Sequence, residues 1–394
     1  MRIVKNIIVL SILLTFLGCE NHEGIQQFPI ITTLDISNLS HEGVNFNAEV
    51  VYLGTSQTTE YGFVWCEEGA SPTINDYKVV LGTTVSLGNF SARIEEHLSE
   101  AWSYNVRAYA IYKNRIVYSN GINFNPSPFS KLDEKLGIGS SFYKALGASN
   151  NNTGYVIMGD GKSYGFNSVH QEFHGINWHN YGRLSQGAQH GDDLYFLDVF
   201  PSTQHLLKLS NNEWSVASYP PFNFTDSEYQ HVFSHSQFMF VVGRSASYGY
   251  DLINDQWAMK NNLIHTSPAK AGVNLGQFAY IITEDKNVYR YNSEVDSWNL
   301  ETTYPGELKD KTVSFSHGDK IYFGLSHNAP NTVDWITNEI WSYDTKTKVW
   351  KEELPFRADL TPGDLFWFKI EDIVYLGNKS SGYYIMYSID VPKL

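Results

Sequence analysis

From residue 28 onward, short stretches of apolar, β-branched and aromatic residues alternate with turn residues. In the first part of the chain these stretches cover residues 30–36, 44–53, 61–66, 90–94, 104–112 and 115–124. Six or seven short strands within about 100 residues are typical of two packed antiparallel sheets. The pattern therefore predicts a β-sandwich over residues 28–125.

Residues 140–394 contain a repeat in which a turn is followed by an aromatic residue within an apolar strand. The aromatic residues of the six copies are separated by 40, 45, 40, 42 and 53 residues. They are Tyr155, Tyr195, Phe240, Tyr280, Tyr322 and Tyr375. A period of this length is that of one propeller blade. The repeat therefore predicts six blades, each with a buried aromatic anchor.

A second aromatic residue follows each of the first five anchors after 17 to 28 residues. These residues are Phe173, Trp214, Trp257, Trp298 and Trp350. In the last three of these copies a Tyr precedes the Trp by seven residues, at Tyr250, Tyr291 and Tyr343. The spacing resembles the kelch repeat, whose third strand carries the Tyr and whose outer strand opens with the Trp. The resemblance implies a six-bladed kelch-like β-propeller over residues 126–394, although the Gly-Gly doublet of the family is reduced to single glycines.

The sixth copy ends at Leu394, seven residues after Tyr387, where the outer-strand Trp is expected. A ring with an open edge would expose a row of unpaired backbone groups. We therefore expect residues between about Ser127 and Gly139 to supply the missing strand and to join the two ends of the propeller. A five-bladed or incomplete arrangement is the alternative.

Within residues 28–125, Leu98 lies six residues before Tyr104, and a strand of alternating apolar and polar residues follows. This spacing resembles the fibronectin type III signature with its tyrosine corner. The resemblance implies that the Tyr104 hydroxyl reaches back to the chain that enters its strand. We expect this fibronectin type III-like domain to act as a structural spacer.

The first residues combine the basic Arg2 and Lys5 with an apolar run over residues 7–17, which is the pattern of a secretory signal and is too short to span a bilayer. Residues 16–19, Phe-Leu-Gly-Cys, resemble a bacterial lipoprotein box. The resemblance implies a signal peptide over 1–18, lipidation of Cys19 as membrane anchor, and a polar tether over 19–27. An ordinary signal with an incidental Cys is the alternative. The features together resemble surface lipoproteins of Bacteroidetes and predict a place in the bacterial envelope, on the outer membrane.

The chain carries 28 Lys and Arg against 42 Asp and Glu. Loss of Arg2 and Lys5 with the signal changes the net charge from −14 to −14 − 2 = −16. Nucleic acid requires a basic footprint, so the charge argues against such a partner. Aromatic residues make up 15% of the chain and glycines number 30, which favours strands and turns and an all-β fold. Lipidation of Cys19 would leave Cys66 alone, so we expect no intrachain disulfide.

Blade five carries the one large insertion, since its anchor and Trp are 28 residues apart rather than about 18. Trp335 and His327 lie in this insertion, within residues 325–339. An aromatic ring in a loop that the fold does not require can stack on the apolar face of a sugar or on a partner's side chain. A Trp that folds back onto its own loop is the alternative.

Loops that join the second to the third strand, and the fourth strand to the next blade, emerge on one face of a propeller and are the natural place for function. Other loops of this face supply the rest of the predicted ligand-binding set. These residues are Tyr181, Arg183, Tyr219, Phe224, Arg244 and Tyr248.

Three histidines occupy the same repeat position, five residues before an anchor, at His190, His235 and His317. Equivalent positions on one face suggest a metal site. Blades two, three and five are not all neighbours, however, and zinc ligands must lie within about 2.1 Å of one ion. We therefore expect turn residues and no metal.

No catalytic motif is evident. No Cys follows Cys66, so the Tyr–Cys copper site of galactose oxidase, an enzyme built on a kelch ring, cannot form in the predicted propeller. Sialidase-type turns, a Gly-rich phosphate loop, zinc spacing and a nucleophile elbow are missing from the sequence as well. We therefore predict a protein without a cofactor that binds a glycan or protein ligand and performs no catalysis. The alternative is a sugar-modifying enzyme, such as a kelch-type sialate epimerase, that uses Arg183, Arg244, His265 or His327.

Overall fold

The computed structural model describes residues 27–40, 43–55, 57–99, 102–113, 115–137, 145–150, 152–159, 161–176, 184, 187–198, 204–221, 231–242, 247–262, 267–328, 335–353, 355–356, 360, 362, 364–380 and 383–394. Nearly all of the secondary structure in these ranges is β, and one short 3-10 helix covers Val391–Lys393. The all-β prediction is thus confirmed. Among the described residues no helix is long and apolar enough to cross a membrane. The chain divides into two compact units, Met1–Pro126 (unit 1) and Ser127–Leu394 (unit 2).

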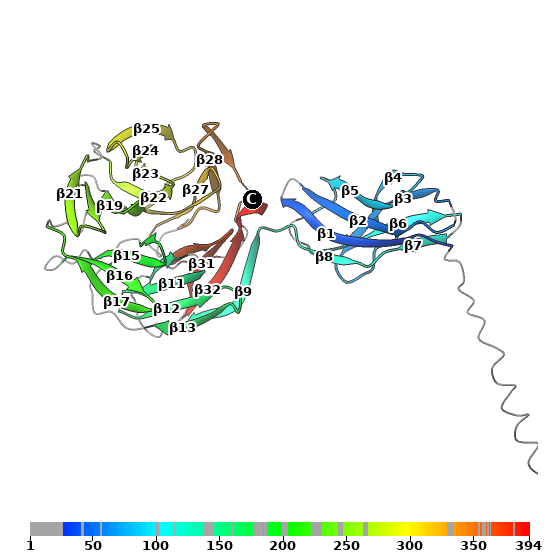
Figure 1. Cartoon of the computed structure of the whole chain (residues 1–394), viewed down its shortest axis with the longest axis horizontal. Helices are drawn as coiled ribbons and strands as arrows, with labels where there is room; N and C mark the ends of the chain where they lie inside the picture. The colour runs from blue at the N-terminus through cyan, green and yellow to red at the C-terminus, as the bar shows by residue number, and fades with distance from the viewer. Residues whose placement is uncertain are drawn as a thin grey trace, which may run out of the picture. The chain divides into compact units, whose positions relative to one another are not determined.

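In the part of unit 1 that the structure describes there are two antiparallel sheets, one with the order β1-β2-β5 and one with the order β4-β3-β6-β7, in which β8 also pairs with β6 (Figure 1). The strands are β1 (Ile30–Ser40), β2 (Gly43–Tyr52), β3 (Glu60–Glu67), β4 (Tyr77–Gly82), β5 (Gly88–Ile94), β6 (Tyr104–Tyr112), β7 (Arg115–Tyr118) and β8 (Ile122–Phe124). Two differences from the sequence prediction stand out. The stretch 115–124 forms two strands rather than one, and β4 was not predicted.

The core of unit 1 draws on both sheets. Phe46 of β2 is fully buried, and its ring lies 5.5 Å from Trp65 and 5.7 Å from Phe63 of β3. At the start of β6, the Tyr104 hydroxyl accepts a hydrogen bond of 2.7 Å from the backbone N–H of Ser99. This bond confirms the predicted reach of Tyr104 back to the chain that enters its strand.

The described residues of unit 2 form six four-stranded antiparallel sheets, numbered here in chain order (Figure 1). Sheet 1 consists of β10 (Ala145–Ser149), β11 (Thr153–Met158), β12 (Ser163–Asn167) and β13 (Glu172–Ile176). Sheet 2 consists of β14 (Ala188–His190), β15 (Asp193–Asp198), β16 (His205–Ser210) and β17 (Glu213–Ser218). Sheet 3 consists of β18 (His231–His235), β19 (Phe238–Val242), β20 (Ser247–Asp251) and β21 (Gln256–Lys260).

Sheet 4 consists of β22 (Ala269–Leu275), β23 (Phe278–Thr283), β24 (Asn287–Asn292) and β25 (Ser297–Thr303). Sheet 5 consists of β26 (Lys311–His317), β27 (Lys320–His327), β28 (Ile340–Asp344) and β29 (Val349–Glu352). Sheet 6 consists of β30 (Leu365–Ile370), β31 (Ile373–Ser380), β32 (Tyr383–Asp390) and, from the start of the unit, β9 (Phe129–Gly137).

The pairing of β9 with β32 completes sheet 6. In its register Ser130 lies opposite Ser388, and Lys131 lies opposite Tyr387. Leu132 and Leu136 of β9 are buried in the same cluster as residues of β31 and β32. The pairing confirms the prediction that residues between about Ser127 and Gly139 supply the strand missing from the last repeat.

The first strands of successive sheets contact one another from β10 to β26, and β30 contacts β10. Side chains bond across these contacts to backbone carbonyls. The Ser314 hydroxyl donates to Gly272 O at 2.7 Å, and the Trp367 indole N–H donates to Ser314 O at 2.9 Å. Sheet 6 therefore lies against both sheet 5 and sheet 1, an arrangement compatible with a propeller-like all-β fold.

The six anchor aromatics are all buried, at no more than 6% exposure, which confirms their predicted core position. The aromatics of the outermost strands are only half-buried, and the indoles of Trp257 and Trp298 bond to the preceding sheet. The indole N–H of Trp257 donates to Ser218 Oγ at 3.1 Å, and that of Trp298 donates to Asn261 O at 2.8 Å. The Tyr–Trp spacing of the sequence thus serves contact between sheets.

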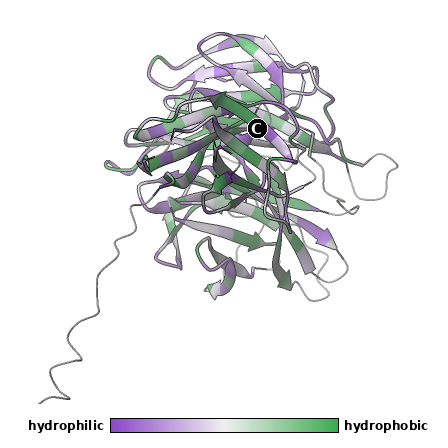
Figure 2. Ribbon diagram, turned by 90° about the vertical axis from the view of Figure 1, so that its right-hand side faces the viewer, coloured by the Kyte–Doolittle hydropathy of each residue, from purple (hydrophilic) through white to green (hydrophobic). Residues whose placement is uncertain are grey.

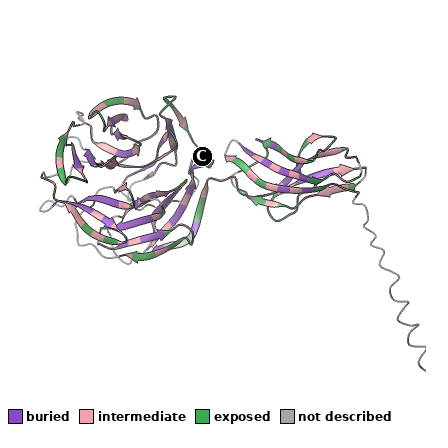
Figure 3. Cartoon of the chain, in the orientation of Figure 1, coloured by how far each residue is buried: buried purple, intermediate pink, exposed green. Residues whose placement is uncertain are grey.

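The outermost strands of unit 2 carry many exposed residues. Figure 3 shows exposed positions along β13, β21 and β25, and Figure 2 shows hydrophobic and hydrophilic residues mixed along the strands, as expected where one face of a strand is buried. In every sheet of unit 2 the first strand begins at the same edge at which the second strand finishes. We call this edge the loop end, and we call the opposite edge the turn end.

Candidate functional site

Four of the predicted ligand-binding residues of unit 2 lie within the described residues: Tyr219, Tyr248, His327 and Trp335. Each lies at or near the loop end of its sheet. Tyr181, Arg183, Phe224 and Arg244 lie outside the described residues, as do His265 and the predicted lipidation site, Cys19. The structure therefore gives the geometry of part of the predicted set.

Trp335 and His327 are core residues rather than exposed loop residues. Trp335 is 7% exposed and belongs to a buried cluster that spans sheets 5 and 6. His327 pairs with Ile336 as an isolated bridge, and the backbone N–H of Asn328 donates to Trp335 O at 2.8 Å. These bonds extend β27 into the insertion and turn the indole inward. The prediction that Trp335 offers an exposed stacking surface is therefore corrected.

The His327 imidazole is buried beside Trp335, with its ring 6.3 Å from the indole. Its Nδ1 lies 3.1 Å from Leu325 O and donates a hydrogen bond there. Burial lowers the pKa of His327, and the carbonyl contact opposes that shift. His327 is therefore part of the buried packing around Trp335.

The clearest group of polar and aromatic side chains at the loop end belongs to sheet 2. Asp198 ends β15 and lies directly opposite His205, which begins β16. The Asp198 carboxylate is 2% exposed, and its Oδ2 lies 3.3 Å from His205 Nδ1. A buried carboxylate that accepts this hydrogen bond fixes the orientation of the imidazole.

Tyr219 completes this group. It directly follows β17 and is 70% exposed, and its ring lies 5.2 Å from the His205 ring at an angle of 64°. Three neighbouring strands therefore bring a fixed polar pair and an open aromatic face together at one end of sheet 2. Tyr248, by contrast, is half-buried on β20 in the next sheet.

Sequence reasoning identified Tyr219 but missed Asp198 and His205. The only signal for them is their position, because each borders the connection between the second and third strands of its copy. The pairing itself comes from the register of β15 and β16, which the sequence does not reveal.

Charged side chains at the loop end of sheets 4 to 6 pair with one another. Lys270 Nζ lies 3.5 Å from Asp310 Oδ1, and Lys311 Nζ lies 3.2 Å from Asp364 Oδ1. The second oxygen of Asp364 accepts the backbone N–H of Ala145, in sheet 1, at 3.0 Å. These contacts cross from one sheet to the next, which assigns them to the cohesion of unit 2.

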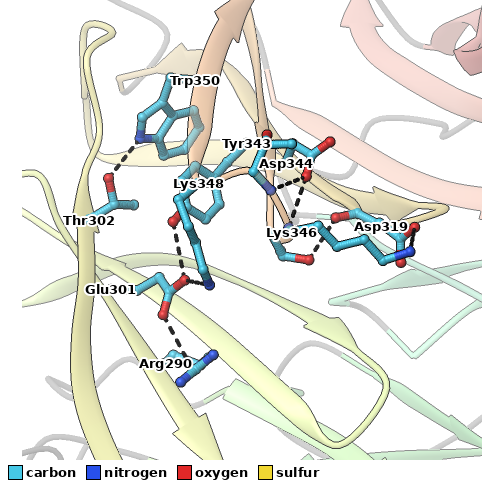
Figure 4. A network of polar contacts seen from close by, with 11 residues as sticks. Arg290, Glu301, Thr302, Asp319, Tyr343, Asp344, Lys346, Lys348 and Trp350 are labelled. Atoms are coloured by element: carbon cyan, nitrogen blue, oxygen red, sulfur yellow. Dashed lines mark hydrogen bonds and ion pairs between the residues drawn. The ribbon is translucent and has the colours of Figure 1, made fainter.

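A second polar network joins the outer strands of sheets 4 and 5 (Figure 4). Glu301 is buried and pairs with Lys348 and with Arg290, whose Nε lies 3.4 Å from Glu301 Oε2. The Tyr343 hydroxyl donates to Glu301 Oε1 at 3.1 Å, and burial is the main cause that raises the pKa of Tyr343. This network is compact and internally paired, and it too holds sheets together.

The three repeat histidines lie at the turn end, and two of them, His235 and His317, have separate acidic partners. His235 Nε2 lies 3.7 Å from Glu294 Oε1, whereas His317 Nδ1 lies 3.3 Å from Asp372 Oδ1. No group of three His, Cys, Asp or Glu side chains able to hold a metal ion occurs among the described residues. These two histidines therefore take part in contacts between sheets.

No protein-family model matches the chain, and no curated protein matches it. Among solved structures, one described as the structure of YjhT aligns with a TM-score of 0.49 at 12% identity, over 66% of this chain and 96% of that chain. A structural genomics protein of unknown function from Bacteroides thetaiotaomicron aligns with a TM-score of 0.49 at 9% identity, over 91% of this chain and 98% of that chain. Identities this low carry no information about activity.

Proposed function

We propose that the mature chain is a lipid-anchored protein of the bacterial cell envelope that binds glycans at the loop end of unit 2 without altering them. In this proposal unit 1 is a fibronectin type III-like sandwich and unit 2 is a six-bladed kelch-like propeller. Six four-stranded sheets in cyclic contact support the propeller, and the Tyr104–Ser99 bond supports the fibronectin type III-like domain.

The exposed ring of Tyr219 beside the Asp198–His205 pair carries the binding proposal. Sugar rings present apolar C–H faces that pack on aromatic side chains, and their hydroxyls need fixed polar partners. Tyr219 supplies the first kind of surface. The buried carboxylate holds the imidazole in place and so supplies preorganised polarity beside it.

The test uses a soluble form that begins at residue 20, and compares its affinity for a glycan selected on a glycan array with that of variants. Tyr219→Ala should weaken binding about 5- to 100-fold, which corresponds to about 1–3 kcal/mol. Tyr52→Ala is the matched control, because Tyr52 is an exposed tyrosine of unit 1. Equal affinities of Tyr219→Ala and the unaltered protein would refute the site. Retention of a protein rather than a glycan by the same face would point to a protein ligand.

A sugar-modifying enzyme is the second candidate, and the Asp198–His205 pair favours it. A carboxylate that orients an imidazole is a common arrangement for general acid–base catalysis. An enzyme of this kind should lose turnover in His205→Gln with little change in ligand affinity. If the chain is a binding protein, both the unaltered protein and His205→Gln should leave the glycan unchanged.

A further inference from the structure

An aromatic stack in unit 1 has no role in the proposed function. The Tyr77 ring on β4 stacks on the Trp65 ring of β3, with centroids 5.9 Å apart at 28°. It also stacks on the His97 imidazole, with centroids 4.7 Å apart at 11°. Trp65 is buried, whereas Tyr77 is 45% exposed and the His97 side chain is 56% exposed. The stack thus runs from the core to the surface.

Two hydrogen bonds to aromatic residues of the core hold the β5–β6 connection that carries His97. The Trp65 indole N–H donates to His97 O at 3.3 Å, and the Ser99 N–H donates to the Tyr104 hydroxyl. His97 itself has a φ of +60°, a left-handed conformation that is uncommon outside glycine. These contacts fix the backbone at His97, and the imidazole itself stacks on Tyr77. Such preorganisation lowers the entropic cost of binding.

The same connection displays a second large aromatic residue, Trp102, at 55% exposure. An exposed indole offers a flat apolar face on which a ligand can pack. Two carboxylates accompany these rings, Glu95 and Glu96, with side chains 68% and 87% exposed. Residues 28–126 carry 5 basic and 10 acidic residues, a net charge of 5 − 10 = −5. Glu95 Oε1 lies 3.5 Å from Arg93 Nε, and Glu96 Oε2 lies 4.0 Å from His97 Nε2. The surface is therefore aromatic, with acidic side chains beside it.

We infer that this surface of unit 1, comprising Tyr77, His97 and Trp102, is a second binding site, and that its ligand is an uncharged glycan. The exposed rings pack against the C–H face of a pyranose, and the carboxylates accept hydrogen bonds from its hydroxyls. The net negative charge of this unit disfavours uronic and sialic acids relative to neutral sugars. This site is separate from the one proposed in unit 2.

The experiment uses the soluble form from residue 20 with Tyr219→Ala as background, which removes the site proposed in unit 2. Cellohexaose, maltohexaose, mannohexaose, laminarihexaose and an acidic hexauronate are titrated by calorimetry. At least one neutral hexasaccharide should bind, and His97→Asn or Trp102→Ala should weaken that binding about tenfold. Asn removes the ring but tolerates the left-handed backbone. Tyr52→Ala should change nothing, and circular dichroism of unit 1 checks that each variant is folded.

Three results would overturn the inference. The first is that no neutral hexasaccharide binds in the Tyr219→Ala background. The second is that His97→Asn and Trp102→Ala bind the hexasaccharide as tightly as the background protein does. The third is that the hexauronate binds as tightly as the neutral hexasaccharide. Loss of all binding in Tyr219→Ala while the unaltered chain binds would assign the glycan to unit 2 alone. Failure of the site proposed in unit 2 can be distinguished from these results, because Tyr219→Ala would then have the same glycan affinity as the unaltered protein.

Discussion

At the scale of single residues, buried histidines couple the stability of unit 2 to pH. His231, on β18, is 1% exposed, and its Nε2 donates to Asn274 Oδ1, on β22, at 2.7 Å. Burial lowers the pKa of His231 to about 4, although the contact with Asn274 opposes this shift. The unfolded chain binds a proton near pH 6.5, whereas the folded chain does so only near pH 4. The stability contributed by the neutral imidazole is therefore complete above pH 6.5 and is lost as pH falls toward 4.

His231→Gln should flatten this part of the pH dependence. The free energy of unfolding of the unaltered protein should fall by about 3 kcal/mol more than that of the variant between pH 7.5 and pH 4. Urea denaturation of unit 2 at several pH values measures the difference. Parallel curves for the two proteins would contradict the assignment.

The Glu301 network offers a second prediction at this scale (Figure 4). Glu301→Gln should destabilise unit 2 by about 1–3 kcal/mol, because it leaves Arg290 and Lys348 without their shared buried carboxylate. The matched control is Asp319→Asn. Asp319 pairs with Lys346 at 2.6 Å, but both side chains are more than half exposed, so this loss should be below about 0.5 kcal/mol. Equal shifts of the urea midpoint in the two variants would refute the structural role of Glu301.

At the scale of elements, β9 determines whether sheet 6 is complete. Deletion of residues 127–139 removes the strand that pairs with β32 and two buried leucines, Leu132 and Leu136. The deletion should abolish the cooperative thermal transition of unit 2 and leave that of unit 1 intact, as followed by calorimetry. An unchanged transition of unit 2 would show that β9 is dispensable.

Periodic features of this chain could be predicted from the sequence, and non-periodic ones could not. The anchors and the Tyr–Trp pairs recur in register, so each copy supports the others. β4 was missed because it is a half-exposed edge strand with no clear alternation. The stretch 115–124 splits because the buried Ser119 turns from the strand and bonds to Ala108 and to Thr33.

The candidate site was harder to predict because its contacts do not recur from one repeat to the next. The burial of Trp335 depends on the bridge between His327 and Ile336, and the Asp198–His205 pair depends on strand register. Both are contacts made only in the folded chain. Tyr219 could be predicted from the sequence because the prediction of an aromatic residue in a loop does not depend on any contact of the folded chain.

At the scale of the whole molecule, the proposed anchor at Cys19 makes membrane attachment separable from folding. Cys19→Ala should move the protein from the membrane fraction to the soluble fraction without changing the thermal transitions of either unit. Two lipid chains are needed for stable attachment, and both depend on this cysteine. Unchanged partition of the variant into membranes would contradict the anchor.

The central claim is that this protein binds a glycan through the loop end of unit 2 and leaves it unaltered. The most direct measurement is a glycan array probed with the mature chain and with Tyr219→Ala, followed by mass analysis of every glycan that binds. The account predicts binding that is weaker in the variant, with each glycan recovered unchanged. Conversion of a bound glycan into a product, or binding indifferent to Tyr219, would contradict it.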